Sequence, residues 1–192
     1  MNMQSLRQPL HPLPRFSSIA SFFDWAERQE RIYELVDGAP HLLPWVKLNH
    51  ARIVTNLLTL IASRIDRDVL EVTAGDFAVQ VGSNSVRFAD VMVFPAGKDG
   101  SLRTVSDAVL LIEVLSESTA HVDLDAKLHE YQALDALGCY VVIDQDRVHV
   151  RNWTRSDDGS WPSEASITDD RSASVTMLQF ELPLAEVYRG VN

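Results

Sequence analysis

The sequence contains very little cysteine, since Cys139 is the only one in 192 residues. A single cysteine excludes an internal disulfide, and nothing else in the composition indicates an oxidising compartment. No uninterrupted apolar run approaches the ~20 residues that a membrane-spanning helix needs. The N-terminal residues also lack the apolar segment of a signal peptide. Together these absences predict a cytoplasmic protein that makes no contact with a membrane.

Basic residues are also scarce, with 17 Lys and Arg against 27 Asp and Glu and a formal net charge of -10. This balance disfavours binding of nucleic acid through a broad basic surface, because neutralising phosphates requires Lys and Arg. It does not exclude a nuclease, since a bound metal ion supplies positive charge locally within a cleft. The remaining composition, 46% hydrophobic and 23% charged, is that of an ordinary globular domain.

Motifs of several other enzyme classes are missing as well. The six histidines show neither H-x-H nor H-E-x-x-H spacing, which disfavours a zinc site. The sequence has no glycine-rich phosphate-binding loop. A glycosidase with a pair of carboxylates is a weaker hypothesis than the two developed below. Its weakness is that no aromatic residues can be assigned to stacking on a sugar.

Two carboxylates that interrupt apolar stretches are the most informative feature that is present. Asp90 lies within residues 86–94, and Glu113 lies within residues 108–115. A carboxylate in a buried strand is costly to desolvate unless it is paired or binds a metal. Mg²⁺ is typically held by one or two carboxylates together with substrate phosphate. Two acids on successive strands, followed by Lys127 on the next helix, therefore predict a metal-dependent site that cleaves phosphodiesters.

The pattern of apolar residues predicts an α/β fold in one domain. Prolines predict an extended arm over residues 1–16, which leaves residues 17–192 for the domain. Expected helices follow a cap at Ser17 or Ser18, follow a cap at Asn49, and cover residues 123–136. Expected strands cover residues 31–36, a return strand to about 46, 77–81, 86–94, 108–115, 139–143, 147–154 and 175–180, with a loop over 97–106. The strand–helix–strand order over residues 108–143, with hairpins at both ends, predicts a mixed sheet.

An ordered set of short motifs runs through most of the chain. It comprises Tyr33–Gly38, His50, Phe88–Val91, Leu111–Ser116, Ser118, Thr119, Asp123, Lys127 and Tyr131. This set resembles the Uma2 family of restriction-endonuclease-like domains. The resemblance covers roughly residues 20–155, and the set is specific although each motif alone is weak.

The resemblance implies a PD-(D/E)XK nuclease fold, in which a mixed central sheet is flanked by helices. It also implies cleavage of DNA that depends on Mg²⁺ or Mn²⁺, and the pairing of two sites in a homodimer. Asp90 and Glu113 match the two motif acids. By the same matching, Glu34 completes the metal site, and Val114 contributes its backbone carbonyl to the metal.

Two departures from the family pattern matter. The superfamily motif places a lysine two positions after Glu113, but Leu115 stands there. The resemblance implies that the lysine comes from the following helix, as Lys127. Ala89 replaces the usual proline before Asp90, and that proline is not a ligand. The missing local lysine and the acidic composition keep open a second hypothesis, a nuclease-fold domain that acts as a binding or regulatory module.

Each candidate also has a purely structural interpretation. Asp90 could face solvent from an edge strand, and Glu113 could belong to a buried ion pair. Lys127 could pair on the helix surface with Glu130 or Asp123. Glu34 precedes a turn and could be an ordinary surface residue.

Two further residues are expected to have structural rather than catalytic roles. A histidine in the position of His50 more often caps or packs near a helix start than acts in catalysis. Tyr131 is more consistent with a core residue than with a residue that lines a cleft.

Overall fold

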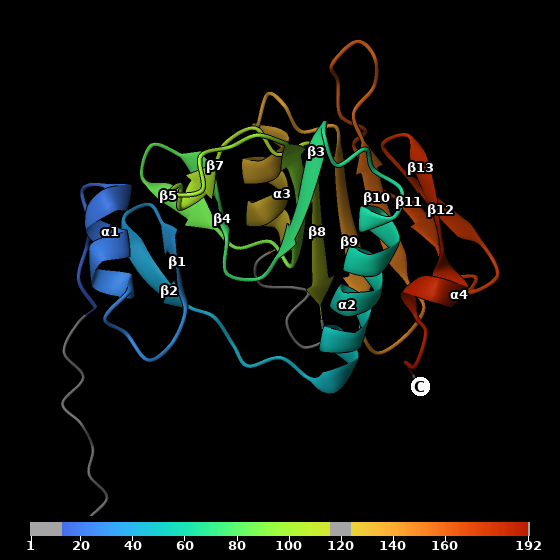
Figure 1. The fold of residues 1–192 in the computed structure, drawn as a ribbon, viewed down its shortest axis with the longest axis horizontal. Coiled ribbons are helices and arrows are strands. Elements are labelled where there is room, and N and C mark those ends of the chain that lie inside the picture. The colour runs from blue at the N-terminus through green and yellow to red at the C-terminus, as the bar shows by residue number, and fades with distance from the viewer. Residues whose placement is uncertain (1–12, 116–123, 192) are drawn as a thin grey trace, which may run out of the picture.

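Two mixed β-sheets organise the fold of this chain (Figure 1). The computed structural model describes residues 13–115 and 124–191. The larger sheet consists of β11 (Ser166–Thr168), β10 (Val150–Thr154), β9 (Cys139–Asp144), β8 (Leu110–Leu115), β6 (Val91–Pro95) and β3 (Leu70–Ala74), in that order. The smaller sheet consists of β2 (Ala39–Leu42), β1 (Tyr33–Val36), β5 (Ser85–Arg87), β4 (Ala78–Gly82) and β7 (Thr104–Val105).

Helices flank these sheets, as the resemblance implied. They are α1 (Ile19–Ala26), α2 (Leu48–Ala62), α3 (Leu124–Gln132) and α4 (Leu184–Val187) within the described residues, beside a hairpin of β12 (Ser174–Met177) and β13 (Phe180–Pro183). Strands β8 and β9 are parallel, with α3 between them in the chain, whereas the other pairs in the larger sheet are antiparallel. The prediction of an α/β fold with a mixed sheet is confirmed.

The central strand β8 has two different faces because successive side chains of a strand point in opposite directions. Leu110 and Ile112 pack into the cluster that contains Ile53 and Leu57 of α2. Leu111 packs into the second cluster, which contains Tyr131 of α3. Alternation therefore places the side chain of Glu113 on the face of the sheet that α3 covers.

The helix α1 begins as the sequence predicted, since the side chain of Ser18 accepts a hydrogen bond from the backbone N–H of Ser21. The predicted cap of α2 was wrong. Lys47 occupies the N-cap position without a side-chain hydrogen bond, and Asn49 lies inside the first turn, where its Oδ1 accepts from Arg52. The apolar spacing located this helix correctly, but it could not specify which residue precedes the first turn.

Residues 86–94 do not form the single strand that the sequence predicted. β5 ends at Arg87 and β6 begins at Val91, and the two strands belong to different sheets. Asp90 therefore lies in the connection immediately before β6 rather than within a strand. The chain passes from one sheet to the other at this point, and Asp90 accepts a hydrogen bond from the backbone of β8 at Val114.

Other element boundaries also differ from the predictions. The return strand ends at Leu42 instead of residue 46, and the predicted strand over 175–180 is two strands separated by Leu178, whose φ is 54°. Helix α3 ends at Gln132 because Leu134 N–H bonds to the carbonyl of Tyr131, an i→i+3 contact that tightens the last turn. The strand β3 was missed, and β7 lies inside the loop predicted over 97–106.

Several sequence-based predictions fall on residues outside the described ranges. They are most of the arm over residues 1–16, together with Ser116, Ser118, Thr119 and Asp123. Residues 13–16 carry no helix or strand. The longest helix within the described part of the chain, α2, has 15 residues, fewer than the ~20 needed to cross a bilayer.

Candidate active site

Helix α3 places two side chains on Glu113 of β8. Lys127 Nζ lies 3.0 Å from Glu113 Oε1, and the Tyr131 hydroxyl donates to the same oxygen at 2.8 Å. Residues four apart on a helix share one face, which explains why both reach the same carboxylate. All three side chains are buried, and Glu113 is only 3% exposed. Glu130 accepts from Arg87 instead of pairing with Lys127 along the helix surface, so that half of the structural interpretation was wrong. The other partner considered, Asp123, lies outside the described residues.

Asp90 lies beside Glu113 because of the register of the sheet. Val91 pairs with Ile112, so the residue before β6 meets the end of β8 where Glu113 stands. Asp90 Oδ2 accepts the backbone N–H of Val114 at 2.7 Å, and Oδ1 lies 3.0 Å from His50 Nε2. The side chain of Asp90 is 22% exposed, so it forms the more accessible end of the acidic pair.

His50 is a residue whose contact the sequence analysis did not anticipate. It stands in the first turn of α2, and the packing of α2 against the larger sheet brings its ring to Asp90. Its position among the motifs at the start of a strongly amphipathic helix was the one available signal. Tyr131 was expected to be a core residue, and it is buried, but its hydroxyl also contacts the candidate site.

Glu34 joins the cluster from β1 and is not a surface residue, since it is 2% exposed. Its Oε2 accepts from Arg87 Nη1 at 2.9 Å, and its Oε1 accepts from the Phe88 backbone N–H at 3.0 Å. Lys127 Nζ lies 3.5 Å from Oε1. These contacts make Glu34 a counterion for two buried cations, and its role as a metal ligand stays a prediction.

Arg87 is a second residue that the sequence analysis missed. Besides Glu34, it contacts Glu130 through two hydrogen bonds, from Nε at 2.7 Å and from Nη2 at 2.9 Å. A planar guanidinium is suited to this two-point contact with a carboxylate. Arg87 thereby connects the smaller sheet to α3, the helix that supplies Lys127. A basic residue inside the apolar stretch 86–94 was the signal that could have identified it.

Burial and neighbouring charges set the protonation behaviour of Glu113. Burial is the main cause that raises the pKa of Glu113 to about 7, and Lys127 opposes that rise. The negative charges of Asp90 and Glu34 raise the pKa further, whereas the hydrogen bond from Tyr131 lowers it. The pKa of Tyr131 is raised well above its usual value by burial and by Glu113. Three carboxylates are thus close enough to influence one another around one lysine.

The oxygen donors of this cluster suit one kind of metal. Both contacts of Glu113 fall on Oε1, and no hydrogen bond from the residues in the described ranges reaches Oε2. Within those ranges, no three His, Cys, Asp or Glu side chains are grouped closely enough to bind a metal together. Two carboxylates with open positions fit Mg²⁺ or Mn²⁺, which keep several waters, better than a closed zinc site. The carbonyl of Val114 as a further ligand stays a prediction.

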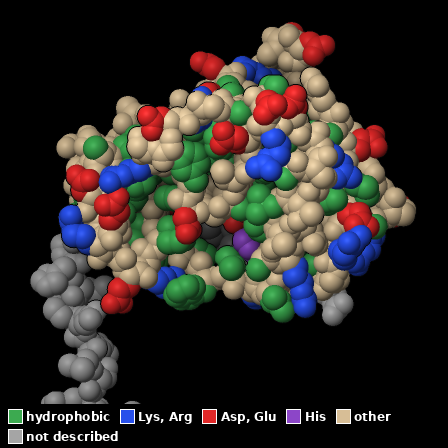
Figure 2. Space-filling view, viewed as in Figure 1, with side chains coloured by type: hydrophobic (Ala, Val, Ile, Leu, Met, Phe, Trp, Pro, Cys, Tyr) green, Lys and Arg blue, Asp and Glu red, His purple; other side chains and the backbone are tan. Residues whose placement is uncertain are grey.

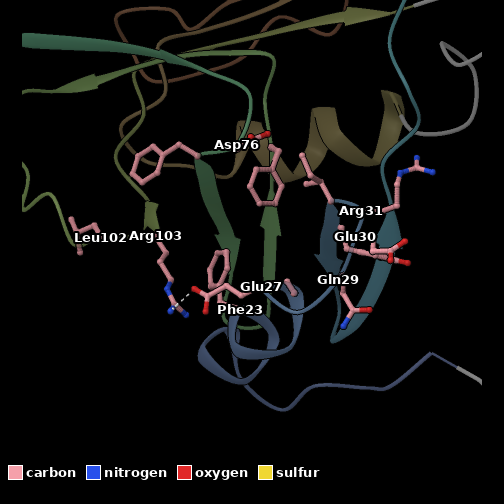
Figure 3. Close-up of a pocket in the computed structure, with 13 residues that line it drawn as sticks. Phe23, Glu27, Gln29, Glu30, Arg31, Asp76, Leu102 and Arg103 are labelled. Atoms are coloured by element: carbon pink, nitrogen blue, oxygen red, sulfur yellow. Dashed lines mark ion pairs between the residues drawn. The ribbon is translucent and has the colours of Figure 1, made fainter.

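A cavity of about 470 Å³ lies on the other side of the smaller sheet (Figure 3). Phe88 is one of the residues that line this cavity, and its backbone N–H contacts Glu34. The rim carries Glu30 and Asp76, and Arg103 there is already paired with Glu27. None of Asp90, Glu113 and Lys127 lines this cavity, so it is separate from the carboxylate–lysine cluster. Figure 2 shows a histidine side chain near the middle of the face viewed.

The mixed sheet, the two adjacent acids and the helix-borne lysine define a restriction-endonuclease-like domain. The sequence model of the Uma2 family, described as "Putative restriction endonuclease", matches residues 19–185. The chain belongs to this family, as its motifs indicated.

Two relatives from Synechocystis sp. (strain ATCC 27184 / PCC 6803 / Kazusa) and one solved structure are similar to this chain. "Uncharacterized protein slr1290" is 28% identical over 185 residues, which cover 95% of this chain and 96% of the relative. "Uncharacterized protein sll1609" is 28% identical over 152 residues, which cover 76% of this chain and 86% of the relative. The crystal structure of a "putative nuclease belonging to DUF820" from Anabaena variabilis ATCC 29413 superimposes with a TM-score of 0.70 at 16% identity, covering 87% of this chain and 95% of that one. At this identity the superposition shows that the fold is shared.

Proposed function

We propose that this protein is a metal-dependent endonuclease that hydrolyses phosphodiester bonds in DNA. The observation that carries the proposal is the convergence of Asp90, Glu113 and Lys127 in a member of a nuclease-like family. Each of these side chains has a chemical role that phosphodiester hydrolysis requires. The proposed location is the cytoplasm, and cutting both strands would require a second copy of the chain.

Asp90 and Glu113 would hold Mg²⁺ or Mn²⁺, with the carbonyl of Val114 as the proposed third protein ligand. When bound, the metal would polarise the phosphoryl group and lower the pKa of an attacking water. The chain prepares both carboxylates for this role. Tyr131 fixes one oxygen of Glu113, and His50 orients Asp90 together with the backbone of β8.

Lys127 would stabilise negative charge that develops on the phosphoryl oxygens. It is buried, so its field is screened less by water than the field of a surface lysine. Glu34 lies 3.5 Å from Lys127 Nζ, and Arg87 holds Glu34 in turn. This arrangement directs the ammonium group toward Glu113 instead of toward solvent. Because the chain carries a net charge of -10, productive binding of DNA should depend strongly on the metal.

A plasmid-nicking assay tests this proposal. Supercoiled DNA is incubated with wild-type protein in Mg²⁺ or Mn²⁺, and the same assay is run with Asp90→Asn and Glu113→Gln. Asp107→Asn is the matched control, because it removes a charge from an acid that pairs with Lys98 outside the cluster. Wild type and the control should cut the DNA, and the rate of cutting by the two site variants should be lower by a factor of at least about 100. Equal cleavage by Asp90→Asn would contradict the proposal.

A binding or regulatory module is the second candidate function. It is favoured by Leu115 at the motif lysine position and by the lack of a third closely grouped ligand among residues 13–115 and 124–191. This candidate predicts that wild-type protein cleaves no DNA in either metal. It also predicts that Asp90→Asn retains whatever partner binding the wild type shows.

A further inference from the structure

The connection between β2 and α2 exposes an unusual amount of apolar surface. Trp45 is 80% exposed, Leu48 65%, Val46 60% and Leu42 49%. A contiguous exposed apolar patch of this kind marks an interaction site more often than chance. Figure 2 shows hydrophobic side chains along the lower edge of the molecule, where Figure 1 draws this connection. We refer to residues 42–48 as the platform segment.

Positive charge accompanies the exposed indole of the platform segment. The guanidinium carbon of Arg31 lies 4.3 Å from the centroid of the Trp45 ring, and Arg31 Nη2 donates to the Leu43 carbonyl at 2.7 Å. Arg31 therefore packs against one face of the indole, while Trp45 stays largely exposed to solvent. Lys47 is exposed two residues further on. An open aromatic ring beside two cations, in a chain with a net charge of -10, matches the requirements of a nucleic acid strand.

The platform segment is directly continuous with the candidate active site. Helix α2 begins at Leu48, and His50 in its first turn lies 3.0 Å from Asp90. An extended chain spans about 3.4 Å per residue, so the Cα atoms of Trp45 and His50 are at most about 17 Å apart. One strand of DNA advances about 3.4 Å per nucleotide. The backbone of Trp45 thus lies within about the length of five nucleotides of His50, whose ring contacts Asp90.

We propose that Trp45 stacks on an unpaired base of the DNA strand that is bound at the Asp90–Glu113 site. This inference rests on the proposed function. In a duplex both faces of each base are already stacked, so only an unpaired or flipped-out base offers a face to an indole. The preferred substrate is therefore DNA with a single-stranded segment close to the scissile phosphate. Arg31 and Lys47 contact the phosphates that flank that base.

The test is a binding measurement with fluorescein-labelled oligonucleotides, by anisotropy, on the full chain. A Glu113→Gln background blocks cleavage, and Mn²⁺ is added at a concentration that saturates the weakened metal site. One probe is single-stranded and the other is the same strand in a blunt duplex. Trp45→Ala should weaken binding of the single-stranded probe about 10-fold, and binding of the duplex less than about twofold. Trp45→Phe should retain most of the affinity. Ile167→Ala is the matched control, because Ile167 is 58% exposed on β11, away from the platform segment.

Three results would overturn the inference: unchanged single-stranded affinity in Trp45→Ala, equal losses on both probes, or no binding of single-stranded DNA by the parent protein. Sedimentation of the same samples separates an alternative occupant, a second copy of the chain. If Trp45→Ala converts a dimer to a monomer and leaves DNA affinity unchanged, the surface is a subunit interface. The nicking assay is independent of these outcomes. Binding that depends on Trp45 without any cleavage would contradict the proposed function and support the role of Trp45. Cleavage together with binding that does not depend on Trp45 would support the proposed function and contradict the role of Trp45.

Discussion

Replacing Glu113 by Gln should change how the stability of the fold depends on pH. In the folded protein burial raises the pKa of Glu113 to about 7, against an ordinary value of 4.5. Between these two pH values the folded state retains the proton and the unfolded state has released it. The free energy of unfolding must therefore fall as pH rises through this window.

The size of this effect follows from the same pKa values. Each pKa unit corresponds to about 1.4 kcal/mol, so the rise from 4.5 to about 7 represents a loss of about 3 kcal/mol by pH 8. The loss includes the attraction of Lys127, which limits the rise. A glutamine has nearly the same shape and still accepts a hydrogen bond from Tyr131, but it does not ionise. As pH rises from 5 to 8, the free energy of unfolding of the variant should therefore increase relative to that of wild type by about 3 kcal/mol.

Urea unfolding followed by tryptophan fluorescence at pH 5, 6, 7 and 8 measures this difference, with a chelator present to exclude metal. Glu181→Gln is the matched control, because Glu181 is an exposed acid on β13, and its profile should run parallel to that of wild type. Parallel profiles for Glu113→Gln and wild type would refute the reasoning. They would mean that the carboxylate is not held in a buried, acid-rich environment.

Three further predictions concern the support of the cluster and the fold. Arg87→Met leaves two carboxylates without their guanidinium partner and should lower the free energy of unfolding by about 3 kcal/mol, which a urea midpoint nearly equal to wild type would contradict. Tyr131→Phe removes a hydrogen bond that lowers the pKa of Glu113, so the pH window above should move upward, and an unmoved or lowered window would count against the assigned contact. Gly38→Ala should destabilise the β1–β2 turn by about 2 kcal/mol in thermal unfolding, since φ is +77° and a Cβ would lie 2.6 Å from the Phe16 carbonyl oxygen; a change below about 0.5 kcal/mol would contradict this.

The acids of the candidate site could be located from sequence because of their apolar neighbours. Glu113 stands between residues that must be buried, and burying a carboxylate requires a compensating partner. The strand–helix order over residues 108–143 then indicated that α3 would return over the same sheet. The family resemblance then indicated Lys127 on this helix, although only the structure shows that its ammonium group reaches Glu113.

What sequence reasoning missed depends on contacts between distant segments. His50 reaches Asp90 only because α2 packs against the larger sheet, and no local pattern specifies that distance. Arg87 was hidden because residues 86–94 were interpreted as one strand, whereas the chain changes sheets after Arg87. The predicted C-terminal strand is interrupted at Leu178, whose φ is positive. Leucine rarely adopts a positive φ, so the residue type does not indicate a turn here.

The central claim is that Asp90 and Glu113 together bind one divalent metal ion. Calorimetric titration of the metal-free protein with Mn²⁺ tests it most directly, using wild type, Asp90→Asn, Glu113→Gln and the Asp107→Asn control. We predict one site per chain in wild type and in the control, with affinity reduced at least about 10-fold in both site variants. Equal Mn²⁺ affinity in all four proteins, or no binding by wild type, would contradict the claim.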